Sequence, residues 1–90
     1  MGNEKQQNNL INLIFSITGK KITQEKVNLN QPLKVPAEKA LKDSGSSRPL
    51  DEYEIVYEGR KLSSSDKVEN FDFPEGAVIF LSLRTGQGGN

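Results

Sequence analysis

Apolar residues in the middle of the chain recur with the period of two that is typical of β-strands. In residues 10–18, alternate apolar residues share one face: Ile11, Leu13, Phe15 and Ile17. Leu10 and Ile14 make the opposite face apolar as well, which predicts a central strand covered on both sides. Residues 77–83 are also apolar on both faces and predict a second central strand.

Two weaker strands accompany these segments. Residues 22–29 alternate less clearly and predict a strand near a sheet edge, joined to the first by a turn at Gly19-Lys20-Lys21. Residues 53–57 predict a third strand, with a short extension that starts at Leu62. We expect residues 63–76 to be irregular, with three inward-facing anchors: Val68, Phe71 and Phe73.

One helix is predicted between the second and third strands. Pro32 or Pro36 is expected in its first turn, where a missing N–H costs nothing. A narrow face of small and apolar residues follows the helical period: Leu33, Ala37, Ala40, Leu41 and Ser44. Gly45 can take the left-handed conformation that ends a helix.

This order of elements predicts an α+β domain with a mixed sheet of four to five strands and one helix across one face. If the first and last strands are the central, parallel pair, the arrangement is a β-grasp. We expect residues 10–83 to form this single domain, with flexible polar ends at residues 1–9 and 84–90.

The composition excludes several functions. The 12 basic and 12 acidic residues cancel, so no strong field favours nucleic acid or an anionic membrane. The absence of cysteine and histidine removes thiol catalysis, the usual metal ligands and the commonest general base. We expect no enzyme, no metal, no cofactor and no membrane span, and a cytoplasmic monomer.

Several motifs then resemble the ubiquitin family. The stretch Tyr53–Leu62 (YEIVYEGRKL) is similar to the family's third strand and turn, and Thr18-Gly19-Lys20 to its first hairpin turn. Pro49 and Asp51 occupy the loop after the helix, where the family commonly has these residues. Leu81–Arg84 followed by Gly88-Gly89 resembles the last strand and the diglycine tail. The divergence from ubiquitin suggests a protein of a bacterial or archaeal conjugation-type operon.

The resemblance implies a protein modifier whose partners are an activating enzyme, a conjugating enzyme, a processing peptidase and a target protein. The carboxyl carbon of Gly89 is then the reactive atom, and Gly88-Gly89 is the flexible strand that fits an activating-enzyme channel. Because Asn90 follows the diglycine, we expect a peptidase to remove it. Arg84 matches the arginine with which the family contacts its activating enzyme.

The same resemblance also implies a recognition surface. Ile17, Val56 and Phe80 match positions of the family's exposed hydrophobic patch, while Ser82 is polar where the family has an aliphatic residue. Burial of Ile17 and Phe80 in the core is the alternative for these positions. Arg60 replaces the family's best-known chain-linkage lysine, and Lys20 matches another family lysine.

Two other functions stay open at this point. One is a sulfur carrier, which shares the fold and holds a thiocarboxylate on its terminal glycine. The other is an interaction domain that is never conjugated, for which the glycine-rich tail is incidental.

Overall fold

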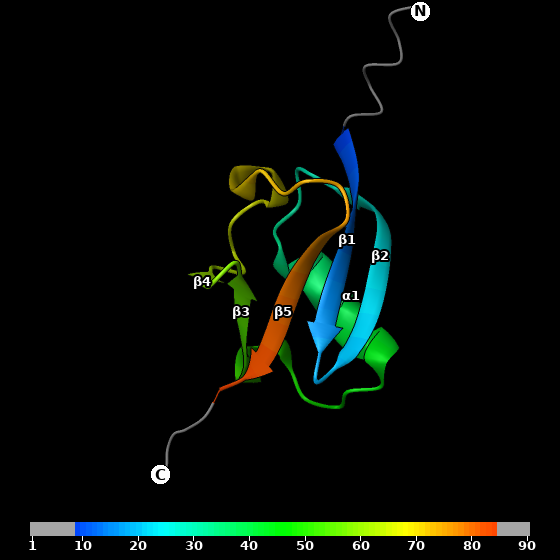
Figure 1. The fold of residues 1–90 in the computed structure, drawn as a ribbon, viewed down its shortest axis with the longest axis vertical. Coiled ribbons are helices and arrows are strands. Elements are labelled where there is room, and N and C mark those ends of the chain that lie inside the picture. Colours follow the sequence, from blue (N-terminus) through cyan, green and yellow to red (C-terminus); the bar gives the residue numbers. More distant parts are fainter. Residues whose placement is uncertain (1–8, 85–90) are drawn as a thin grey trace, which may run out of the picture.

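The computed structural model describes residues 9–84, which form one sheet crossed by one helix (Figure 1). The strands are β1 (Leu10–Ile17), β2 (Lys20–Asn28), β3 (Tyr53–Tyr57), β4 (Arg60–Leu62) and β5 (Ala77–Leu83). The helix is α1 (Lys34–Ser44), and two short 3₁₀ helices are η2 (Leu50–Glu52) and η3 (Val68–Phe71). The predicted α+β fold is confirmed.

The strand order is β2-β1-β5-β3-β4. β1 and β5 are the parallel central pair, with Phe15 beside Ile79 and Ile17 beside Leu81. The other neighbours, β1 with β2, β5 with β3, and β3 with β4, are antiparallel. This is the β-grasp arrangement that the order of elements predicted.

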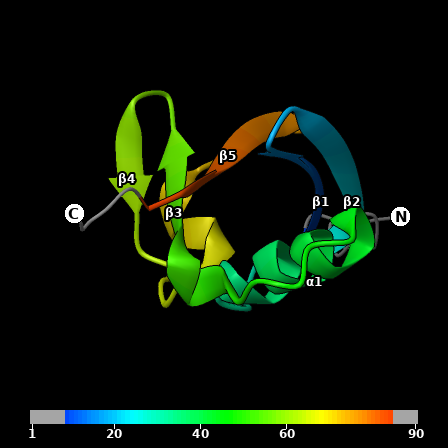
Figure 2. The ribbon, with the colours of Figure 1, turned by 90° about the horizontal axis from the view of Figure 1, so that it is seen from below.

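Helix α1 lies across one face of the curved sheet (Figure 2). Its buried residues are Pro36, Ala37, Ala40 and Leu41. They meet the inward side chains of the sheet, among them Leu13, Phe15, Ile55, Ile79 and Leu81. The helix ends at Gly45, whose φ of 89° is left-handed, and the N–H groups of Gly45 and Ser46 donate to Lys42 O and Leu41 O. Pro36 stands in the first turn, as expected.

The expectation that β1 is covered on both sides is wrong. Ile14 is only half-buried on the face away from α1, as is Val78 beside it on β5. Phe80 on the same face is 48% exposed. A single helix can cover one face, and no other element among residues 9–84 packs on the second, so apolar side chains there stay at the surface.

The hairpin between β1 and β2 is tighter than predicted. Ile17 pairs with Lys20, so the turn consists of Thr18 and Gly19 alone, and Lys20 and Lys21 already belong to β2. Both turn residues have positive φ, 47° at Thr18 and 85° at Gly19, as a type I′ turn requires. Glycine adopts this conformation readily, but a β-branched residue does so at a cost.

A β-bulge interrupts the same hairpin further along. The register between β1 and β2 shifts between Ile11 and Leu13. On β2, Lys26 has a φ of 58°, and its N–H donates to the side-chain oxygen of Asn12 at 2.9 Å. The extra residue bends the exposed edge strand at this point.

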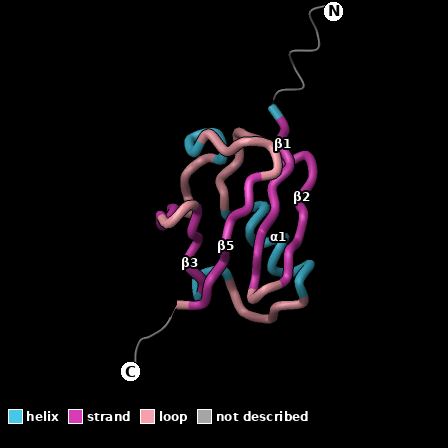
Figure 3. The backbone as a smooth tube through the Cα atoms, viewed as in Figure 1, coloured by secondary structure: helices cyan, strands magenta, loops and turns pink. Residues whose placement is uncertain are grey.

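The long connection from β4 to β5 closes one end of the domain (Figure 3). Val68 and Phe73 are buried and Phe71 is half-buried, so the predicted anchors face inward. The segment is less irregular than expected because it contains η3. It also fixes the start of α1, since Leu33 N donates to Asp66 O and Lys34 N to Ser64 O.

Among residues 9–84, no helix is long and apolar enough to cross a membrane.

Candidate functional site

The predicted reactive terminus, Gly88 and Gly89 with Asn90 after them, lies outside the described residues, as do residues 1–8 and 85–90 of the two polar ends. The described chain reaches Arg84, the residue directly after β5. The site is therefore described from β5 and the elements beside it.

Two hydrogen bonds hold Arg84 against the segment that precedes β3. Its N–H donates to the main-chain oxygen of Glu52 at 2.9 Å, which continues the β5–β3 pairing by one step. Its side-chain Nε donates to the main-chain oxygen of Asp51, also at 2.9 Å. Arg84 thus has a defined position, and its exposed guanidinium keeps two Nη groups for other acceptors.

The core ends before Arg84. Leu81 is 1% exposed, whereas Leu83 is 38% exposed. Leu83, the last residue of β5, therefore lies outside the core.

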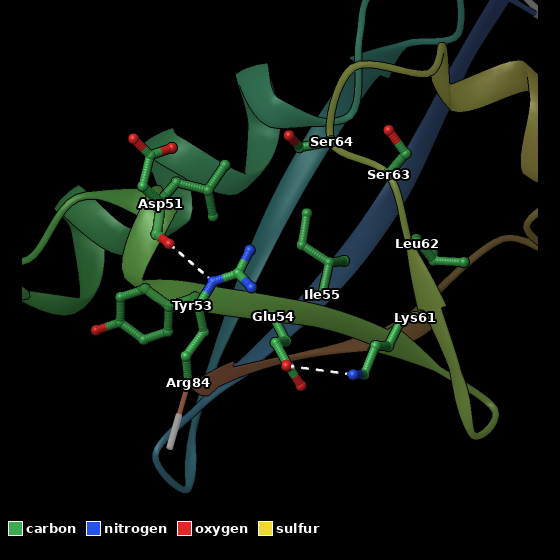
Figure 4. Close-up of a pocket in the computed structure, with 10 residues that line it drawn as sticks. Asp51, Tyr53, Glu54, Ile55, Lys61, Leu62, Ser63, Ser64 and Arg84 are labelled. Carbon is green, nitrogen blue, oxygen red and sulfur yellow. Dashed lines mark hydrogen bonds and ion pairs between the residues drawn. The ribbon is translucent and has the colours of Figure 1, made fainter. Parts of the chain in front are cut away.

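A cavity of about 300 Å³ opens beside the guanidinium (Figure 4). Six of its lining residues define its character: Leu50, Ile55, Lys61, Leu62, Ser64 and Arg84. Glu54 lies at the rim and pairs with Lys61 at 3.4 Å. The cavity lies between the end of β5 and the residues that follow β4. Nothing in the sequence composition predicted it.

An apolar patch occupies the sheet face opposite α1. Val56 on β3 lies directly opposite Phe80 on β5, and Ile14 on β1 lies beside Val78 on β5. We call these four residues the outer patch. The sequence interpretation found Val56 and Phe80 but missed Ile14 and Val78. The signal was present, because Val78 and Phe80 share the alternation of β5.

Ile17 does not belong to this surface. It is 2% exposed and packs in the core, so its assignment to an exposed patch is wrong. The resemblance implied an exposed position for Ile17, and burial in the core was the alternative. In this chain the two-residue turn leaves Ile17 as the last inward-facing residue of β1. Ser82 lies on the outer face beside Glu54 and ends the patch with a polar group.

Two ion pairs lie near the site: Arg48 with Glu52, and Lys61 with Glu54. Arg48 and Glu52 pair at 2.8 Å on the surface, where such pairs contribute little stability. Within residues 9–84, no group of three or more acidic side chains is placed to hold a metal ion. Asp51 and Glu52 are exposed, and Glu54 is half-buried.

The hydroxyl group of Tyr57 has a shifted pKa. Burial, and after it the charge of Glu58 and a hydrogen bond to Glu58, raise the pKa of Tyr57 above its ordinary value of 10.0. The ring of Tyr57 meets Phe73 edge-on at 5.0 Å between centroids. This contact fixes the ring at the end of β3 and makes no link to the cavity beside Arg84.

Lys20, the lysine that matches a family lysine, makes a hydrogen bond to the end of α1. Its Nζ donates to the main-chain oxygen of Ser44 at 3.2 Å. Arg60 begins β4 and is exposed.

The strand order, the parallel central pair and the single helix define a ubiquitin-like β-grasp domain. The chain belongs to the family described as "Protein of Unknown function (DUF2604)", whose sequence model matches residues 6–89. This description assigns no activity to the family.

Two individual proteins are similar to the chain. "Uncharacterized protein y4jI" of Sinorhizobium fredii (strain NBRC 101917 / NGR234) is 35% identical over 81 residues, which cover 88% of this chain and 62% of that protein. The chain thus spans less than two thirds of that relative's length. A solved structure described as designed on the basis of ubiquitin has a TM-score of 0.74 and 20% identity, covering 91% of this chain and 98% of the design. At this identity the likeness shows the fold alone.

Proposed function

We propose that this chain is a ubiquitin-like protein modifier that acts as a substrate of conjugating enzymes and not as a catalyst. The observation that carries the proposal is the position of Arg84. It is fixed at the end of the central strand β5 of a β-grasp domain, five positions before Gly89 in the sequence. The family match extends over both glycines.

The proposed chemistry begins at the peptide bond between Gly89 and Asn90. A peptidase adds water across this bond and releases Asn90 together with anything that follows it. A carboxylate oxygen of Gly89 then attacks the α-phosphorus of ATP, and pyrophosphate leaves. A cysteine thiolate of the enzyme next attacks the acyl carbon and displaces AMP. Finally, a target amine attacks the thioester and releases the thiolate.

The residues of the chain serve recognition in this scheme. The Nη groups of Arg84 bind a carboxylate of the activating enzyme, while Asp51 O keeps the guanidinium oriented. An extended segment of five residues reaches at most about 17 Å, so Gly89 can enter a channel whose mouth lies near Arg84. Val56 and Phe80 form the centre of a surface for partners of the modified target.

We expect this reaction in the cytoplasm, with the chain as a monomer. Genes for an adenylating enzyme, a cysteine-carrying conjugating enzyme and a peptidase are expected beside its own. The bacterial relative supports a bacterial setting for the family.

The test compares purified residues 1–90 with residues 1–89, each incubated with the cognate activating enzyme and ATP. Only the shorter protein should form a thioester. A matched pair of variants of residues 1–89 sharpens the result. Gly89→Ala should abolish or strongly slow thioester formation, whereas Gly86→Ala, which changes a glycine outside the diglycine, should conjugate like wild type.

Mass spectrometry of the protein recovered from its native host separates the other functions. A thiocarboxylate on Gly89 indicates a sulfur carrier. A chain that keeps Asn90 and is never attached to another protein indicates an interaction domain. Either result contradicts the proposal, and an isopeptide remnant of Gly89 on a target amine supports it.

A further inference from the structure

The cavity beside Arg84 contains donors that the described residues leave without acceptors. The Nε atom of Arg84 is bound by Asp51 O at 2.9 Å, which fixes the plane of the guanidinium. Figure 4 shows its two Nη atoms turned away from this oxygen, toward the side of the cavity where Ile55 and Ser64 lie. No hydrogen bond or ion pair within residues 9–84 uses them. A guanidinium held in this way suits a planar oxyanion that accepts two parallel bonds.

The charges around the cavity select among oxyanions. The second cation, Lys61, is already paired with Glu54, so it adds little net attraction. The Asp51 carboxylate, which points away from the guanidinium in Figure 4, is also a lining residue. With Lys61 paired to Glu54, Arg84 is the lining cation left to balance a bound charge, and this favours a monoanion over a dianion because a second negative charge would lack a cation.

The remaining walls combine a small aliphatic surface with hydroxyl groups, which leaves room for a short aliphatic group beside the anion. Leu50 and Ile55 are buried and Leu62 is half-buried, and all three line the cavity. Ser63 and Ser64 supply hydroxyl groups from the segment after β4, although the Ser63 hydroxyl already pairs with that of Ser65 at 3.0 Å. At about 300 Å³, the space admits a carboxylate with a short side chain.

We propose that this cavity is a binding site for an aliphatic carboxylate presented by a peptide, with Arg84 as the binding group and Leu50, Ile55 and Leu62 as the apolar contact. The site belongs to the folded domain itself. It therefore operates whether or not Gly89 is ever conjugated, and it can be measured without any partner enzyme.

The experiment is a nuclear magnetic resonance titration of ¹⁵N-labelled residues 1–90 with three short peptides and, separately, with inorganic phosphate, all at constant ionic strength. N-acetyl-Gly-Leu with a free terminal carboxylate is the first probe. N-acetyl-Glu-Leu-amide carries the carboxylate on a side chain, and N-acetyl-Gly-Leu-amide carries none. Saturable shifts are expected at the Arg84 Nε–H and at the amides of Leu62 and Ser64. The dissociation constant should be on the order of 1 mM, as befits a small ligand in an open cavity.

Comparison of the first two peptides shows whether the site prefers a terminal or a side-chain carboxylate. The third peptide, which has no carboxylate, should bind at least about tenfold more weakly. Arg84→Lys keeps the charge but loses the planar fork, and should weaken binding by about tenfold. Arg60→Lys makes the same change at another exposed site and should leave binding unchanged. The inference is wrong if the amide peptide binds equally well, if Arg84→Lys binds like wild type, if phosphate binds as tightly as the carboxylate, or if the shifts centre on Phe80.

Discussion

Val56 and Phe80 lie directly opposite each other on the antiparallel strands β3 and β5, on the sheet face that α1 leaves open. This pair therefore links β3 and β5 at the surface, and it lies outside the core between the sheet and α1. Phe80 is 48% exposed, whereas Phe15, on the inner face of β1, is 0% exposed.

This difference predicts losses of stability of different size for the same change at the two positions. Phe15→Ala removes a fully buried ring and should lower the free energy of unfolding by about 3–5 kcal/mol. Phe80→Ala removes a half-exposed ring and should cost less than about 1.5 kcal/mol. Urea denaturation of both variants measures the values. Comparable losses at the two positions would show that the outer patch is structural.

Arg84→Glu should block activation without unfolding the domain. The main-chain bond to Glu52 O survives the change, and only the exposed side-chain bond to Asp51 O is lost. A glutamate facing a carboxylate of the activating enzyme should cost a few kcal/mol, on the order of a hundredfold in apparent affinity. ATP–pyrophosphate exchange with the cognate enzyme measures the effect. Arg60→Glu is the control for charge alone, and equal exchange rates for the two variants would contradict the role of Arg84.

Thr18→Asn should stabilise the protein. Thr18 holds a φ of 47° in a two-residue turn, where asparagine followed by glycine is the favoured pair. The threonine hydroxyl bonds only its neighbour, Ile17 O, at 2.6 Å, so little is lost. We expect a gain of about 1 kcal/mol in the free energy of unfolding, measured by thermal or urea denaturation. Glu58→Asn tests the same idea in the β3–β4 turn, where φ is 50°. A loss of stability in both variants would exclude strain at these positions.

The stability of the domain should depend on Tyr57 at high pH. Because the pKa of Tyr57 is raised in the folded protein, the folded state keeps a proton that the unfolded state releases near pH 10.0. The Tyr57 contribution is therefore intact below this pH and is lost as the pH rises through the folded-state pKa. Tyr57→Phe removes this part of the decline. Urea midpoints measured for both proteins from neutral to alkaline pH test it, and identical pH profiles would show that Tyr57 is not involved.

The fold was predictable because its elements depend on local periodicity. The alternation in residues 10–18 and 77–83, and the helical face from Leu33 to Leu41, each correspond to an observed element. Gly45 ends the helix as its type suggested. The error over Ile14 arose from treating apolar residues on both faces as proof of double cover. A one-helix domain cannot provide that cover, and the exposed apolar residues became the outer patch.

The site was less predictable because its geometry depends on contacts between distant residues. Nothing local to Arg84 shows that its side chain binds a main-chain oxygen 33 positions earlier. The residue type at Ile17 suited both an exposed patch and the core, and the length of the turn decides between them. The cavity combines residues from Leu50 to Arg84 and has no sequence motif.

The bulge at Lys26 has a consequence for the behaviour of the protein at high concentration. An open, flat edge strand can recruit a strand of another molecule, and repetition of that step produces sheets without limit. β2 is an edge strand of the sheet, but it is not flat. It bends at the bulge, where the N–H of Lys26 donates a hydrogen bond to Asn12 Oδ1. Its solvent-facing charges include Lys20, Lys21, Glu25 and Lys26. The bend and the charges of β2 thus disfavour continued strand addition at this edge. The outer patch on the sheet face then stays available for reversible contacts.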